Sequence, residues 1–173
     1  ARATGRPALA DCAERLAGLS RSGLSRVLAG PTGERNVYTL VAREAVLCLA
    51  ESEADRLVQL AAVLAVGSRA VWPSTAASQA LIAALPQDVQ AAIVLASDWT
   101  APTVSFDAVL HHGTRASLAL VLSQLALRAG PIVGVRGLAP GETAVPLEAL
   151  VIERALSVNT AAAGGNASLM AIG

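Results

Sequence analysis

The sequence predicts an α/β fold, in which a parallel sheet carries helices on both faces and an extended C-terminal tail follows. Short apolar or β-branched runs alternate with amphipathic helical segments along most of the chain, and turn residues separate them. The last seventeen residues, 157–173, carry no charge and end on apolar side chains. Such side chains lose their burial energy unless they dock against a surface.

Residues 1–29 are expected to form a linker followed by short helices. Residues 1–7 have the composition of a linker, and residues 8–28 place apolar side chains at roughly helical spacing. Gly18 and the Ser22-Gly23 pair interrupt this pattern, which therefore predicts two short helices. The turn at 30–33, Gly-Pro-Thr-Gly, ends them.

The first two strands are predicted at Val37–Val41 and Ala45–Ala50. The former is rich in β-branched and aromatic residues, and the latter is a continuous apolar run, typical of a strand covered on both faces. A helix should follow, with Ser52 as its N-cap, apolar residues of 57–64 facing the sheet and Gly67 as its C-cap.

The remaining elements repeat this alternation. Strands are predicted at 69–72, 91–96, 106–111 and 131–135, helices at 75–85 and 114–128, and loops at 97–104 and 137–142. Because strands joined by helical crossovers pair in parallel, residues 30–145 are expected to form a Rossmann-like layer. Within residues 146–173, Pro146 to Arg154 fit either a helix or a strand, and a short helix followed by the extended tail is the favoured interpretation.

The composition excludes several classes of function. Thirteen basic and thirteen acidic residues balance, so no basic stripe is available for a nucleic-acid backbone. Every basic residue is arginine, which excludes chemistry that needs a lysine amine. The sequence contains no uncharged apolar stretch of about 18 residues, so it does not predict a transmembrane helix. The two cysteines lack metal-ligand spacing, which is consistent with a reduced, cytoplasmic setting.

Few isolated residues indicate chemistry. Cys48 lies within a predicted strand, where a buried apolar role is favoured over that of a catalytic thiol. His111 and His112 end a strand at the edge where sites of α/β proteins form, so an acid–base or metal role is the alternative to a structural one. The two tryptophans are expected to be packing anchors rather than stacking surfaces for a ligand.

Two groups of residues resemble a known protein family. Val151-Ile-Glu-Arg154, Ser157-Val-Asn-Thr160 and Ala163-Gly-Gly-Asn-Ala-Ser-Leu-Met170 resemble the C-terminal motif of long forms of proline utilization A. A second match is Gly30-Pro-Thr-Gly-Glu-Arg-Asn36 with Val46-Leu-Cys-Leu-Ala50. The resemblance runs from about Gly30 to Gly173. Since the sole methionine is Met170, the chain is expected to be part of a longer polypeptide.

The family joins proline dehydrogenase to glutamate semialdehyde dehydrogenase. The resemblance implies a parent enzyme that uses FAD to oxidise proline to pyrroline-5-carboxylate and NAD to oxidise the hydrolysed semialdehyde to glutamate. It implies that the present chain is the C-terminal, aldehyde dehydrogenase superfamily-like domain of such an enzyme. The parent is expected in the cytoplasm, with the surface of the inner membrane as a further location.

The nucleotide-binding elements of aldehyde dehydrogenases are altered at the matching positions. The lysine-proline-serine step reads Trp72-Pro-Ser74, the Phe-Thr-Gly-Ser turn reads His111-His-Gly-Thr114, and no GxGxxG is present. Glu51 lies where a phosphate would sit and would repel it. No cysteine stands in a motif that matches the family's nucleophile. The resemblance therefore implies a non-catalytic domain that binds no cofactor itself.

The resemblance further implies a lid over the semialdehyde dehydrogenase site and the internal passage between the two sites. The partner would be the semialdehyde dehydrogenase domain of the same polypeptide or of a dimer mate. An apolar tail suits a lid because its burial excludes water and desolvates no charge. The residues expected to make lid contacts are Ser157, Val158, Asn159, Thr160, Gly164, Gly165 and Asn166. The alternatives are a stand-alone NAD-binding Rossmann domain and an oligomerisation module.

Overall fold

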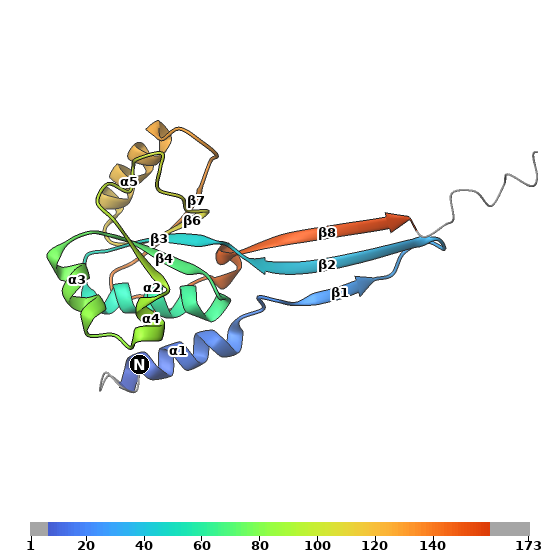
Figure 1. Ribbon diagram of the computed structural model, residues 1–173, viewed down its shortest axis with the longest axis horizontal. Helices are drawn as coiled ribbons and strands as arrows, with labels where there is room; N and C mark the ends of the chain where they lie inside the picture. Colours follow the sequence, from blue (N-terminus) through green and yellow to red (C-terminus); the bar gives the residue numbers. More distant parts are fainter. Residues whose placement is uncertain (1–6, 160–173) are drawn as a thin grey trace, which may run out of the picture.

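Figure 1 shows the computed structural model, which describes residues 7–159. A five-stranded parallel sheet, in the order β5-β4-β3-β6-β7, forms an α/β layer with its helices. A three-stranded antiparallel sheet, in the order β1-β2-β8, projects from this layer as a long arm (Figure 1). We call this arm the flap.

The elements follow one another along the chain in this order: α1 (Pro7–Leu19), β1 (Ser25–Leu28), β2 (Glu34–Ala42), β3 (Ala45–Ala50), α2 (Glu53–Val66), β4 (Arg69–Pro73), α3 (Ala76–Ala83), α4 (Gln87–Gln90), β5 (Ile93–Ala96), β6 (Ala108–His112), α5 (Arg115–Leu127), β7 (Gly134–Leu138), the 3-10 turn η2 (Leu147–Leu150) and β8 (Val151–Asn159). The predicted α/β class with a parallel sheet flanked by helices is confirmed.

Helix α2 begins and ends at the predicted residues. The side chain of Ser52 accepts a hydrogen bond of 3.0 Å from the backbone N–H of Asp55, as an N-cap does. At the other end the chain leaves the helix through Gly67, whose φ of 84° lies in the left-handed region that favours glycine. Thr114 caps α5 in the same way as Ser52, by accepting from the backbone N–H of Ser117.

The parallel sheet is covered on both faces, as the apolar run of β3 predicts. Successive residues of a strand point to opposite faces. Val46 and Cys48 pack on one side with residues of α1 to α4, whereas Ala45 and Leu47 pack on the other side with Leu125 of α5 and with residues of the 97–107 loop. The core is therefore split into two clusters by the sheet.

The prediction of two short helices over residues 8–28 is wrong in its second half. Helix α1 is a single helix that passes through Gly18, and residues 25–28 form strand β1 of the flap. The Ser22-Gly23 interruption is a turn between them. Gly23 has a φ of 82°, and its backbone N–H donates to the carbonyl of Leu40 on β2. A turn that pairs with β2 directs the following residues into a strand.

The C-terminal part also differs from its prediction. Residues 147–150 form a single 3-10 turn, and residues 151–159 are a regular strand rather than a free extended tail. Strand β8 pairs along its whole length with β2. The strand predicted at 37–41 therefore lies in the flap and not in the parallel sheet. Strand β7 is shifted by three residues from its predicted position, 131–135. It therefore includes the first two residues of the predicted 137–142 loop.

Arg43 connects the flap to the layer. Strand β2 runs almost directly into β3, and Arg43 lies between them. Its backbone N–H donates to the carbonyl of Leu150, while its guanidinium donates to the carbonyls of Ala149 and Asp107 at 2.9 and 3.0 Å. The hydroxyl of Ser68 donates to its carbonyl at 2.7 Å. One residue thus bonds to η2, to the residue just before β6 and to the loop between α2 and β4.

Candidate functional site

One face of the flap carries a cluster of exposed apolar side chains, with the exposed Arg35 and Arg154 beside it on the same face. Val27, Val37 and Leu156 lie directly opposite one another across β1, β2 and β8, so their side chains share a face. Val158 follows Leu156 by two residues and points the same way. The exposed fractions of Val27, Leu156 and Val158 are 67%, 60% and 43%. We call these four residues the apolar face of the flap.

The other face of the flap is more polar. Ser157 and Asn159 lie opposite Asn36 and Glu34 on this face. Nearer the layer, Tyr38 is hydrogen-bonded to Glu153. The pKa of Tyr38 is raised by partial desolvation, by this hydrogen bond and by the negative charge of the carboxylate. The two faces therefore differ in the kind of surface that they can contact.

The structure places three of the predicted lid residues. Ser157, Val158 and Asn159 are the last three residues of β8, and Val158 points to the apolar face while its two neighbours point to the other. The other predicted residues, Thr160, Gly164, Gly165 and Asn166, lie outside the described residues. Val27, Val37 and Leu156 were missed by sequence reasoning. No local signal in the sequence identifies them as one surface, because their alignment is set by the register between distant strands.

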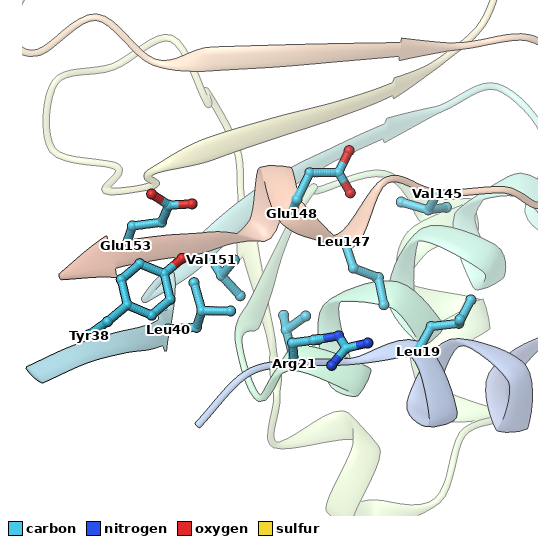
Figure 2. Close-up of a pocket in the computed structure, with 10 residues that line it drawn as sticks. Leu19, Arg21, Tyr38, Leu40, Val145, Leu147, Glu148, Val151 and Glu153 are labelled. Atoms are coloured by element: carbon cyan, nitrogen blue, oxygen red, sulfur yellow. The ribbon is translucent and has the colours of Figure 1, made fainter. Parts of the chain in front are cut away.

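A cleft of 440 Å³ lies where the flap meets the layer (Figure 2). Its apolar walls come from the end of α1, from β2 and β8 and from η2, and include Leu19, Leu40 and Leu147. Figure 2 shows Arg21 extending beneath Leu147, while the carboxylate of Glu148 points away from the cleft. The cleft therefore offers apolar surface, the guanidinium of Arg21 and the hydroxyl of Tyr38 paired with the carboxylate of Glu153.

A second candidate place is the carboxyl edge of the parallel sheet. From β3 the chain continues to β4 and β5 on one side, and it then crosses to β6 and β7 on the other. Ligands of open α/β sheets bind where the strand order reverses, which here is between β3 and β6. Glu51, His111 and Ser117 lie in a cleft of 290 Å³ at this edge.

His111 occupies the space beside the turn that opens α5. A Cβ atom on Gly113 would lie 2.7 Å from Cε1 of the His111 ring and 2.7 Å from Oγ of Ser117. Burial lowers the pKa of His111, more than the nearby Glu51 raises it, so the ring is neutral near pH 7. A neutral ring and a carboxylate provide no positive charge for a phosphate at this position.

His112 is part of the core. The Nε2 amide of Gln59 donates to the carbonyl of Leu49 at 2.9 Å and contacts Nδ1 of His112 at 3.0 Å. Since an amide nitrogen is a donor, Nδ1 accepts, and the proton on Nε2 is donated to the carbonyl of Glu142 at 2.9 Å. Both ring nitrogens are therefore engaged. Within residues 7–159, no group of three or more His, Cys, Asp or Glu side chains is placed to hold a metal ion.

Trp72 and Cys48 lie inside the protein. Trp72, at the position where the resemblance expects a ribose-binding lysine, is fully buried, and the guanidinium of Arg56 lies 5.7 Å from the centre of its ring. Cys48 is also fully buried, and burial raises the pKa of its thiol to about 12. A thiol that stays protonated is a poor nucleophile.

Comparison with known proteins identifies the family. No family model matches the chain. The bifunctional protein PutA of Salmonella typhimurium is 53% identical over 171 residues, which cover 99% of this chain and 13% of that protein. By sequence, the chain belongs with the PutA proteins. PutA of Escherichia coli is 51% identical over 171 residues, which again cover 99% of this chain and 13% of that protein. PutA of Rhizobium meliloti is 41% identical over 167 residues. The chain thus spans about 13% of the length of the first two relatives.

Solved structures agree in fold. A crystal structure of bifunctional PutA matches with a TM-score of 0.53 at 21% sequence identity. The match covers 75% of this chain and 14% of the PutA chain. The γ-glutamyl-γ-aminobutyraldehyde dehydrogenase of Burkholderia cenocepacia has a TM-score of 0.56 at 16% identity, with coverage of 75% and 29%. The chain therefore has the α/β fold found in PutA and in aldehyde dehydrogenases. Among the helices of residues 7–159, none is both long and apolar enough to cross a membrane.

Proposed function

We propose that the chain is the non-catalytic C-terminal domain of a bifunctional enzyme that converts proline to glutamate, and that its flap covers the semialdehyde dehydrogenase site and the passage leading to it. The observation that carries this proposal is the apolar face of the flap. The flap extends away from the α/β layer, so these side chains contact neither cluster of the core (Figure 1). Exposed apolar side chains gathered on one surface are typical of an interaction site.

The edge of the flap supports the same proposal. Within the described residues, β8 pairs on one side with β2 and has no strand on its other side. Over residues 151–158, the outer edge of β8 offers backbone N–H and C=O groups to another segment. A cover built from these groups and from the apolar face would bury apolar side chains and exclude water from a reactive aldehyde.

A structural role, rather than a catalytic one, fits the carboxyl edge of the sheet. His111 is packed against the turn at Gly113, Glu51 would repel a phosphate, and Trp72 is in the core. FAD and NAD would then bind to other parts of the parent polypeptide, which would act in the cytoplasm. The partner of the flap would be the semialdehyde dehydrogenase domain of the same polypeptide or of a dimer mate. Ser157 to Asn159, and residues 160 and 164–166 beyond them, remain the proposed contacts.

The test uses the full-length polypeptide in which this chain stands, with Leu156→Asp as the variant. We expect unchanged proline oxidation with an artificial electron acceptor. Formation of NADH from proline should slow and show a lag, because the intermediate escapes. The control is Ala155→Asp, which places the same charge one residue earlier on β8 and on the other face. Equal fluxes for the wild type and Leu156→Asp, or equal losses for both variants, would contradict the proposal.

A further inference from the structure

Helix α5 carries an apolar surface that is separate from the flap. We propose that the outer side of α5 packs against an apolar helix elsewhere in the same long polypeptide. This inference shares with the proposed function the premise of a longer polypeptide, but it does not depend on the role of the flap. α5 and the tip of the flap lie at different places in the molecule (Figure 1).

The outer side of α5 is unusually apolar. No charged residue occurs between Ala116 and Leu127. Leu120 and Leu127 are 68% and 89% exposed, and Ile132, which follows the helix, is fully exposed. A helix that is apolar on all sides is normally buried on all sides. The structure covers the inner side of α5, where Val121 is buried, and leaves the outer side open.

The spacing on this outer side suits a helix as partner. Ala116, Leu120, Ser123 and Leu127 are separated by four, three and four residues, so they form one stripe along α5. Large and small side chains alternate in it, which lets a second helix place its ridge between the leucines. The hydroxyl of Ser123 donates to the carbonyl of Ala119 at 2.9 Å. The one polar group of the stripe is therefore satisfied within α5 and needs no water.

The α/β layer is thinly covered on the side of α5. Helices α1 to α4 contribute to the cluster on one face, whereas α5 and the 97–107 loop cover the other. On strand β5, Val94 lies opposite Val71, which belongs to the cluster on this face, and is 44% exposed. Parallel sheets are normally buried on both faces. An additional apolar element beside α5 would complete this face.

The length of the relatives favours a partner in the same polypeptide over a second copy. The chain matches 13% of Salmonella PutA, so most of such a polypeptide lies outside it. A segment joined by the chain is present at a high effective concentration, and a weak apolar contact then suffices to hold it.

The experiment measures the accessibility of α5 in the full-length polypeptide. Leu120→Cys and Leu127→Cys are introduced one at a time, and their rates of maleimide labelling are followed by mass spectrometry of the peptide. The reference is Gln79→Cys, an exposed position on α3. We expect both α5 cysteines to react at least about tenfold more slowly than the reference, a ratio that corresponds to about 1.4 kcal/mol. In urea all three rates should become equal.

Two results would overturn the proposal. If the α5 cysteines react as fast as the reference in the folded polypeptide, the stripe is open to solvent. If they are protected but lose this protection on dilution, the stripe is covered by a second copy. Protection that is independent of concentration supports a partner in the same polypeptide. Because the labelling does not involve flux, it can fail while the flap test succeeds, and the reverse is also true.

Discussion

Val37 and Leu156 lie directly opposite each other in the ladder between β2 and β8, although all five strands of the parallel sheet lie between them in the sequence. Their pairing brings the two long strands of the flap together. It also aligns Val37 and Leu156 with Val27 on β1, and this row forms the exposed apolar face. The flap therefore depends on the layer, which holds the starts of β3 and β8 next to each other.

Arg43 should contribute strongly to the junction of flap and layer. In Arg43→Met the side-chain stem remains, but the carbonyls of Ala149 and Asp107 lose their guanidinium donors. We expect the free energy of unfolding to fall by about 1–3 kcal/mol, as measured by urea denaturation. Arg69→Met is the control, because Arg69 forms an exposed pair with Glu44 and should change stability by less than about 1 kcal/mol. Equal effects of the two substitutions would contradict this role.

Cys48 should be unreactive in the folded chain. Burial raises the pKa of its thiol to about 12, so almost no thiolate is present at pH 8. Incubation with iodoacetamide at this pH should leave the peptide that contains Cys48 unmodified, and addition of urea should make it react. Rapid modification without urea would show that the strand opens or that the thiol is accessible.

His111 should make stability depend on pH. Burial lowers its pKa in the folded state, so the unfolded chain takes up a proton first as the pH falls through about 6.5. The stability linked to neutral His111 is therefore complete above this pH. It declines on acidification until the pH reaches the lower folded value. Urea denaturation between pH 5 and 8 should show a smaller decline for His111→Phe than for the wild type, and equal declines would refute the prediction.

The chain should not bind NAD. Its carboxyl edge presents Glu51 and a neutral His111 where a dinucleotide needs donors and positive charge. Calorimetric titration of the purified chain with NAD should give no saturable heat, whereas the full-length polypeptide should bind normally. Saturable binding by the chain that is abolished by substitution of Thr114 would instead support a stand-alone NAD-binding domain.

The self-association of the chain tests the remaining alternative, an oligomerisation module. Sedimentation measurements over a range of concentrations would show a mass that rises with concentration if the flap or the tail were exchanged between subunits. A constant monomer mass would leave the lid as the favoured role.

Local signals in the sequence predicted the α/β layer well. Ser52 and Gly67 mark the ends of α2 because capping depends on residues within one turn of the helix. The apolar run of β3 predicted a strand buried on both faces for a similar reason. The flap was missed because its register is set by pairing between β2 and β8, and no local pattern specifies a distant partner.

In the candidate site, too, features set by single residues could be predicted, and features set by pairing between distant strands could not. The substitutions at Trp72 and Glu51 could be read from the sequence because they change the chemistry of single positions. The apolar face could not, since Val27 lies in a segment predicted to be helical and its alignment with Leu156 requires two ladders. The role of Trp72 as a packing anchor was predicted and is confirmed by its burial, whereas its contact with Arg56 could not be read from the sequence.

Strands β2 and β8 of the flap lie before and after the parallel sheet in the sequence, and this order has a consequence for how the molecule folds. The β2–β8 ladder encloses nearly all of the layer in one loop, and closure of a long loop is costly until the contacts within it have formed. The layer should therefore assemble first and the flap last. During synthesis the flap can be completed only after Asn159 has left the ribosome, so nascent chains would carry a finished layer and a β2 that is paired with β1 but not yet with β8.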